Sequence, residues 1–126
     1  MECVIDSSGW IHYFLNGPVA EQYAKYIQKL SRIVTPTVVI YEVYKTVKRS
    51  TNEAMACDAI ESLQRTTIVP LDADLACSAA DISLECKLSM ADAVVYATAR
   101  KYGVPLYTSD KDFKNLPNVK CIPTEE

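Results

Sequence analysis

The chain has 126 residues, 49% of them hydrophobic and 23% charged, with a formal net charge of −3 at pH 7. This composition can bury one core in a single domain, 1–126, and its five cysteines, which have no CxxC spacing, favour reduced thiols over disulfides or zinc ligands. The negative charge excludes a surface that is basic throughout, while the absence of an export signal and of an apolar run near the roughly 20 residues of a membrane span predicts a cytoplasmic protein.

Segments typical of strands and of helices alternate along the chain. Short apolar runs predict strands, and apolar residues that repeat every three or four positions predict amphipathic helices. Gly17-Pro18 separates two helices, and Thr35-Pro36 supplies an N-cap with proline at the first helical position. In chain order we expect a strand at 2–6, helices at 7–15 and 19–30, a strand at 32–34, helices at 36–50 and 53–65, a strand at 66–71, helices at 72–87 and 89–103, and strands at 104–108 and 119–122.

This alternation predicts an α/β fold with three layers, α/β/α, around a central and mostly parallel sheet. In such a sheet, ligands bind beyond the carboxyl ends of the strands, near the point where the strand order reverses. Polar residues that follow strands are therefore the first candidates for a functional site.

Four acidic residues stand at the edge of apolar segments or inside them. Asp6 ends the first predicted strand and Asp110 follows the fourth, while Asp92 lies in the first turn of a helix and Glu42 two turns into another. If the fold gathers these residues, unit charges about 4 Å apart repel by roughly 4 kcal/mol per pair at an effective dielectric of 20. Such a cluster must take up protons or hold a cation.

Three of these acids also have a purely structural interpretation. Asp6 is well placed to be the N-cap of the following helix, and Asp92 is the acidic member of a capping box that starts at Ser89. Asp110 lies in a polar turn and can serve as a turn residue. Taken singly, none of these positions requires a metal ion.

Glu42 is harder to explain structurally, because it stands between two apolar positions of a very apolar helix. Lys45 and Arg49 follow it at three and seven residues, so a surface stripe of ion pairs is the structural alternative. The prediction of a functional site rests on the four acids together.

Four sequence segments resemble the PIN-domain family in their order and spacing. That family has an Asp followed by Ser or Thr after the first strand, a Glu in the helix after the second strand, an Asp at the start of a later helix, and an acidic segment after the fourth strand. The matching segments here are VIDSS with Asp6, VVIYEVYK with Glu42, LSMADAVVYATAR with Asp92, and TSDKDF with Asp110. The resemblance spans nearly the whole chain, and the length of the chain resembles that of the small VapC-type toxins.

This resemblance implies a metal-dependent endoribonuclease that hydrolyses RNA phosphodiester bonds, with Asp6, Glu42, Asp92 and Asp110 as its catalytic residues. Asp6, Asp92 and Asp110 are the expected direct ligands of Mg²⁺ or Mn²⁺, ions that prefer oxygen donors. Glu42 is expected to bind through water or to orient the attacking water.

Three further polar residues are expected beside the ligands. Ser7 and Thr108 offer hydroxyl groups that can orient carboxylates or waters, and Ser7 can equally belong to the helix cap. Asp112 can join the site or make a local backbone hydrogen bond in its turn.

The expected partners are an RNA substrate, a cognate antitoxin of the VapB type and a second copy of the chain in a homodimer. The antitoxin and the homodimer are implied by the resemblance alone. Lys45, Lys48 and Arg49 form a basic cluster that can hold RNA phosphates beside the acids, and a solvated helix face is the alternative for them.

Two other functions remain to be compared with a nuclease. One is a PIN fold without catalysis that binds RNA or acts as a scaffold. The other is a magnesium-binding signalling module of the receiver type, which should carry paired acids after its first strand, whereas Asp6 is followed by two serines. A phosphoaspartyl phosphatase is disfavoured because Ser8 occupies the position of its second Asp.

Overall fold

A computed structural model describes residues 2–124 of the chain. Five parallel strands form one sheet in the order β3-β2-β1-β4-β5. The strands are β1 (Cys3–Ile5), β2 (Ile33–Pro36), β3 (Thr67–Val69), β4 (Leu106–Thr108) and β5 (Val119–Cys121). Because the chain first builds β1 to β3 toward one edge and then places β4 on the other side of β1, the strand order reverses between β1 and β4.

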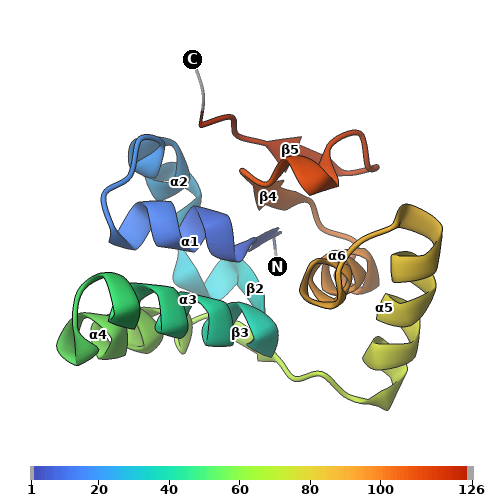
Figure 1. The fold of residues 1–126 in the computed structure, drawn as a ribbon, viewed down its shortest axis with the longest axis horizontal. Coiled ribbons are helices and arrows are strands. Elements are labelled where there is room, and N and C mark those ends of the chain that lie inside the picture. The colour runs from blue at the N-terminus through green and yellow to red at the C-terminus, as the bar shows by residue number, and fades with distance from the viewer. Residues whose placement is uncertain (1, 125–126) are drawn as a thin grey trace.

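Six α-helices and two 3₁₀ turns connect the strands, and the helices cover both faces of the sheet (Figure 1). Right-handed crossovers require the helices before β2 and β3 to lie on one face, and the helix pair before β4, which crosses the sheet in the opposite direction, to lie on the other. The predicted α/β/α fold is therefore confirmed. The helices are α1 (Ser7–Phe14), α2 (Ala20–Ile27), α3 (Thr37–Ser50), α4 (Glu53–Leu63), α5 (Ala73–Cys86) and α6 (Met90–Tyr102), and the 3₁₀ turns are η1 (Leu30–Arg32) and η2 (Lys111–Phe113).

The central strand β1 is buried along its whole length, as expected for a parallel strand covered on both faces. It pairs with β2 through Cys3↔Ile33 and with β4 through Ile5↔Tyr107. Within residues 2–124, no helix is long and apolar enough to span a bilayer. The largest side chains of the core that are fully buried are Trp10, Tyr23, Phe113, Ile5, Ile33, Leu63 and Leu106.

Several predicted boundaries differ from the structure by one to three residues, and two of these differences have an identifiable cause. Thr35-Pro36 does not start a helix: both residues extend β2, where they pair with Ile68 and Val69 of β3, and Pro36 is the N-cap of α3. Thr35 is buried, and its Oγ1 accepts a hydrogen bond from the Thr66 hydroxyl at 2.6 Å. Pairing with β3 therefore outweighs the local capping signal.

The helix expected at 19–30 is also shorter than predicted. It ends at Ile27, and the chain turns through η1 before β2 begins. At that turn, the Glu2 amide donates to the Arg32 carbonyl at 2.8 Å, and the side chains of the same two residues form an ion pair. These contacts bring the chain back beside β1 and prevent continuation of the helix.

Gly9 permits the close approach of α1 to α2. A Cβ atom at this position would lie 2.3 Å from Cε1 of Tyr23 and 2.7 Å from Cγ2 of Ile5. Both neighbouring side chains are fully buried, so neither can move aside cheaply. The small residue is required by packing, because Gly9 lies within a regular helix.

We predict that Gly9→Ala lowers the free energy of unfolding by about 1 to 3 kcal/mol, the usual cost of overpacking a core, as measured by chemical denaturation. Gly103→Ala is the control, because Gly103 has a φ of 65° but no atom within 4 Å of its added Cβ. Its cost should be limited to about 1 kcal/mol of backbone strain. Equal losses for the two variants would contradict the packing argument.

Candidate active site

Asp6 lies directly after β1, at the strand-order reversal where parallel α/β sheets bind ligands. It is the N-cap of α1, and only 2% of its surface is exposed. Its Oδ1 accepts the Ser7 amide at 2.8 Å, and its Oδ2 accepts the hydroxyls of Ser8 at 3.2 Å and Thr108 at 2.8 Å. The capping interpretation is thus correct for Asp6, but capping accounts for only one of these three hydrogen bonds.

Hydroxyl groups join the end of β1 to the end of β4. The Thr108 hydroxyl, which donates to Asp6, also accepts the amide of Asp110 at 3.0 Å. Ser8 Oγ accepts the amide of Ser109 at 3.0 Å and lies 3.4 Å from Thr108 Oγ1. The two segments that carry Asp6 and Asp110 are therefore held in a fixed relation.

Tyr23 supports this network from within the core. Its hydroxyl lies 2.7 Å from Ser109 Oγ, and the residue itself is fully buried. Burial raises the pKa of Tyr23 to about 12, so the hydroxyl keeps its proton at neutral pH. Tyr23 thereby connects helix α2 to the loop that precedes Asp110.

Three carboxylates converge beyond the sheet. Asp92, Asp110 and Asp112 each offer an oxygen, and these oxygens lie within 4.8 Å of one another. Asp110 is the N-cap of η2 and accepts the Asp112 amide at 2.9 Å, so the turn interpretation holds as well. Ser89 caps α6 and accepts the Asp92 amide at 3.4 Å, which leaves the Asp92 carboxylate to face the other acids.

Glu42 enters the same cluster from α3 and is only partly exposed. Burial raises its pKa, the Asp92 and Asp110 charges raise it further, and Ser7 and Lys45 act in the opposite direction. The contributions to its pKa thus indicate that Glu42 lies near Asp92 of α6 and near Asp110, which follows β4.

The two most strongly affected acids are Asp6 and Asp92. Burial raises the pKa of Asp6 to about 6, with Glu42 adding to the rise and the hydrogen bonds from Thr108, Ser7 and Ser8 opposing it. Burial also raises the pKa of Asp92 to about 6, and the charges of Asp6 and Asp110 contribute.

Lys45 is a basic residue that opposes the rise in the pKa of Glu42. The ion pairs described for residues 2–124 join Arg32 to Glu2, Lys48 to Glu53 and Arg65 to Glu61, and none involves the five acids.

Hard divalent cations take carboxylate oxygens as ligands, so this donor set fits Mg²⁺ or Mn²⁺. Asp92, Asp110 and Asp112 are close enough together to hold the ion, whereas Asp6 and Glu42 influence the pKa values of the cluster but lie outside this group of three. Their role as ligands remains a prediction.

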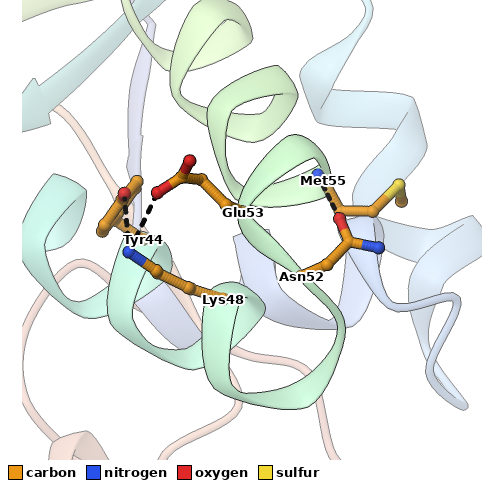
Figure 2. A network of polar contacts seen from close by, with 5 residues as sticks. All are labelled: Tyr44, Lys48, Asn52, Glu53 and Met55. Atoms are coloured by element: carbon orange, nitrogen blue, oxygen red, sulfur yellow. Dashed lines mark hydrogen bonds and ion pairs between the residues drawn. The ribbon is translucent and has the colours of Figure 1, made fainter.

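The residues of the predicted basic cluster make different contacts in the structure. Lys45 lies close enough to Glu42 to lower its pKa. Lys48 points elsewhere, because its Nζ contacts Tyr44 Oη at 3.4 Å and Glu53 Oε1 at 3.2 Å (Figure 2). No described contact connects Arg49 with the acids. Lys45 is therefore the member of this cluster that reaches the site.

Sequence reasoning missed three residues of the hydroxyl network: Ser8, Tyr23 and Ser109. The position of Ser8 after Asp6 indicates locally no more than a helix cap, and the apolar spacing around Tyr23 indicates no more than a packing residue. The pairing of β1 with β4 brings Ser8 beside Ser109, and nothing in the local sequence indicates that pairing.

We predict that the metal-free protein becomes more stable as the pH falls from about 7.5 to about 5. For Asp6 and Asp92, the pKa is about 6 in the folded state and 3.8 for an ordinary aspartate, so the folded state binds more protons in this window. Protonation of these two carboxylates therefore stabilises the folded state, and this stabilisation is lost as the pH rises through about 6. After allowance for solvent screening, we expect roughly 1 to 2 kcal/mol, or a rise of about 3 to 8 °C in Tm measured by calorimetry.

Asp92→Asn is the control for this measurement. The amide keeps the shape of the side chain and removes one charge, so the variant should be more stable than the original protein at pH 7.5 and should respond less to pH. Mg²⁺ or Mn²⁺ should raise the Tm of the original protein more than that of the variant. A steeper pH response in the variant would contradict the electrostatic argument.

We also predict that Tyr23→Phe lowers stability by about 1 kcal/mol and weakens Mn²⁺ binding several-fold in titration calorimetry, because it removes the hydroxyl that supports Ser109. Tyr96→Phe is a matched control. The Tyr96 hydroxyl donates to the Pro117 carbonyl at 2.7 Å, so its loss should cost similar stability without changing the Mn²⁺ affinity. A similar change of Mn²⁺ affinity in both variants would exclude a positioning role for Tyr23.

Comparison with known proteins supports the fold and the family. No curated protein sequence matches the chain. A protein of a Klebsiella pneumoniae toxin–antitoxin complex is similar in structure with a TM-score of 0.80 and 22% identity, covering 94% of this chain and 96% of its own. VapC20 of Mycobacterium tuberculosis, a toxin that cleaves the sarcin–ricin loop, has a TM-score of 0.78 and 21% identity, covering 97% and 100%.

A third similar structure is a chain of VapBC2 from Rickettsia felis bound to promoter DNA, with a TM-score of 0.75, 16% identity and coverage of 99% and 100%. Such identities establish the likeness of fold alone. The model of the PIN domain family matches residues 3–119, which is most of the sequence. The chain therefore belongs to the PIN domain family.

Proposed function

We propose that the protein is a metal-dependent endoribonuclease and the toxin of a toxin–antitoxin pair. The observation that carries the proposal is the group of three carboxylates within 4.8 Å of one another, with Asp6 and Glu42 close enough to raise pKa values in the cluster, at the strand-order reversal of a PIN fold. The similar structures include a toxin that cleaves an RNA loop and members of toxin–antitoxin complexes.

In the proposed reaction, Asp92 and Asp110 would hold the cation together with Asp112, and Asp6 would complete the set of ligands. A divalent cation supplies Lewis-acid chemistry at such a site, polarising a phosphodiester oxygen and making water more acidic. Glu42 orients the attacking water, and its raised pKa suits it to accept the proton that this water loses. Attack forms one bond to phosphorus and breaks the bond to the leaving ribose oxygen, which takes up a proton.

The hydroxyl groups act by positioning. Thr108 and Ser8 donate to one oxygen of Asp6, and the Ser7 amide donates to the other, so the orientation of this carboxylate is fixed before any ligand binds. A preorganised acid loses little freedom when the substrate arrives.

The proposal includes an antitoxin of the VapB type, a homodimer and a cytoplasmic location. Support for the antitoxin comes from the similar proteins, several of which are described in complexes of this kind. Tyr13 and Tyr26, which are 38% and 39% exposed on α1 and α2, offer aromatic surface for such a partner.

The receiver-type alternative does not fit the sheet. Flavodoxin-like and receiver domains have the strand order 2-1-3-4-5, whereas this sheet has the order 3-2-1-4-5. The alternative that remains is a noncatalytic PIN protein, which would bind RNA without cutting it.

The deciding experiment is cleavage of a mixed RNA pool by the purified protein with Mg²⁺, with Mn²⁺ and with a chelator. We predict cleavage that requires the ion and falls by at least about 100-fold in Asp92→Asn, because even the outer partners of metal ligands contribute about 10- to 100-fold. Asp58→Asn, an exposed position on α4, is the control and should cleave normally. A folded protein that cuts nothing with either ion would leave the noncatalytic alternative.

A further inference from the structure

Helix α3 carries an exposed aromatic and cationic face beside the acid cluster. Tyr41 is 63% exposed, the most of any aromatic side chain among the exposed large hydrophobic residues. Tyr41, Tyr44, Lys45 and Lys48 are separated by three, four and seven positions, so they share one face of the helix. Val39, Val43 and Val47 form the buried face of α3. Packing of the helix against the core therefore gives no reason for an exposed tyrosine at position 41.

Helical geometry orders these residues around the axis. At about 100° per residue, Lys45 lies about 60° from Glu42, Tyr41 lies about 40° beyond Lys45, and Tyr44 lies about 60° farther on. A path from Glu42 across the outer side of α3 thus meets first a cation, then an exposed ring, then a second ring.

The contacts agree with this order. Lys45 Nζ lies 5.6 Å from the centre of the Tyr41 ring, and the Lys45 charge lowers the pKa of Glu42, so one side chain is close to both. The second pair is less available, because Lys48 Nζ lies 5.3 Å from the Tyr44 ring and also contacts Glu53 (Figure 2).

The path ends in a groove of about 480 Å³ between α3 and α4. Its walls are mainly apolar and aromatic, with a carboxylate and an amide at the edge that can exchange hydrogen bonds with a planar polar ring. This combination of a mainly apolar wall with a few polar groups is typical of small-molecule sites. The lining residues are Ile40, Tyr41, Tyr44, Cys57, Ile60, Glu61 and Gln64.

We propose that this groove binds a nucleobase of single-stranded RNA whose backbone continues to the acid cluster, with the base stacked on Tyr41. The inference rests on the proposed nuclease function and specifies its substrate as unpaired RNA. Lys45 contacts the phosphate between the groove and the cluster. Stacking requires an unpaired base, because bases within a duplex are stacked on one another.

Charge favours RNA over a second copy of this chain as the occupant. The chain carries a net charge of −3 and a group of three acids within 4.8 Å of one another, so an approaching polyanion needs a local cation to enter. Lys45 supplies that charge between Glu42 and the exposed ring. A ring face and a cation held together match the base and the phosphate of one nucleotide.

The experiment measures the affinity for a labelled short oligouridylate and for the same backbone with abasic sites, by fluorescence anisotropy with Mg²⁺. The protein carries Asp92→Asn to prevent cleavage, so binding is read without activity. We expect Tyr41→Leu to weaken oligouridylate binding about tenfold and Tyr41→Phe to change it less than about twofold. The protein that keeps Tyr41 should bind the abasic backbone about tenfold more weakly than the oligouridylate. The affinity for the abasic backbone should not fall further in Tyr41→Leu.

Two companion variants separate the contributions. Lys45→Ala should weaken binding of both probes and reduce the dependence of log affinity on log salt by about one unit. Tyr102→Leu is the matched control, because Lys101 Nζ lies 5.9 Å from the Tyr102 ring, forming an equivalent pair at the far end of α6, roughly 15 Å along the helix from Asp92. Tyr102→Leu should bind RNA normally.

The inference and the nuclease proposal can fail separately. Cleavage by the original protein with equal RNA affinity for Tyr41→Leu and Tyr102→Leu would overturn the nucleobase site and leave the nuclease intact. Equal affinity for the oligouridylate and the abasic backbone, or no binding of either, would also overturn it. If Tyr41→Leu instead converts a dimer to a monomer in sedimentation and binds RNA normally, the groove is a self-association surface. Tyr41-dependent RNA binding without any cleavage would support the site and contradict the nuclease.

Discussion

The hydrogen bond from the Thr108 hydroxyl to the Asp6 carboxylate is the contact on which the site depends. It joins the ends of two neighbouring strands, and the same hydroxyl accepts the Asp110 amide, so one oxygen atom sets the position of two acids. Ser8 and the Ser7 amide complete the shell around Asp6. A carboxylate that is almost fully buried requires such donors, because burial without them would leave it protonated.

The acid cluster lowers the stability of the folded protein. Burial and mutual repulsion raise the pKa values of Asp6, Glu42 and Asp92, so near neutral pH the folded chain carries charges that it would hold at lower cost if unfolded. The rest of the molecule compensates through a continuous apolar core beneath the site. Functional sites commonly reduce stability in this way, and a bound cation would remove much of the conflict.

The sequence predicted the layers of the fold and the acids of the site, because both leave local signals. Alternating strand and helix patterns indicate a parallel sheet. An acid that follows an apolar run can be recognised in the sequence without knowing which residues lie beside it in the fold. For Asp6 and Asp92, the capping interpretation does not exclude the predicted site role, because Asp6 caps α1 through Oδ1 alone and Asp92 contributes its amide to the cap of α6. The strand order was not predictable, because the same alternation suits several doubly wound sheets.

Features that depend on long-range pairing were beyond local reasoning. Thr35 and Pro36 carry a typical helix-start signal, but pairing with β3 decided their conformation. The apolar spacing of Tyr23 indicated burial and could not indicate that its hydroxyl meets Ser109, 86 positions away. The groove beside Tyr41 likewise depends on which side of α3 is covered by α4.

The bond between Thr108 and Asp6 spans 102 positions of the chain, and β4 is the fourth of the five strands to be synthesised. Residues 2–105 alone therefore lack the donor that orients Asp6 and also lack Asp110 and Asp112. During translation, the acid cluster can form only after most of the chain has left the ribosome and β4 has inserted beside β1. The acid cluster is thus completed only at the end of synthesis, a delay produced by chain topology alone.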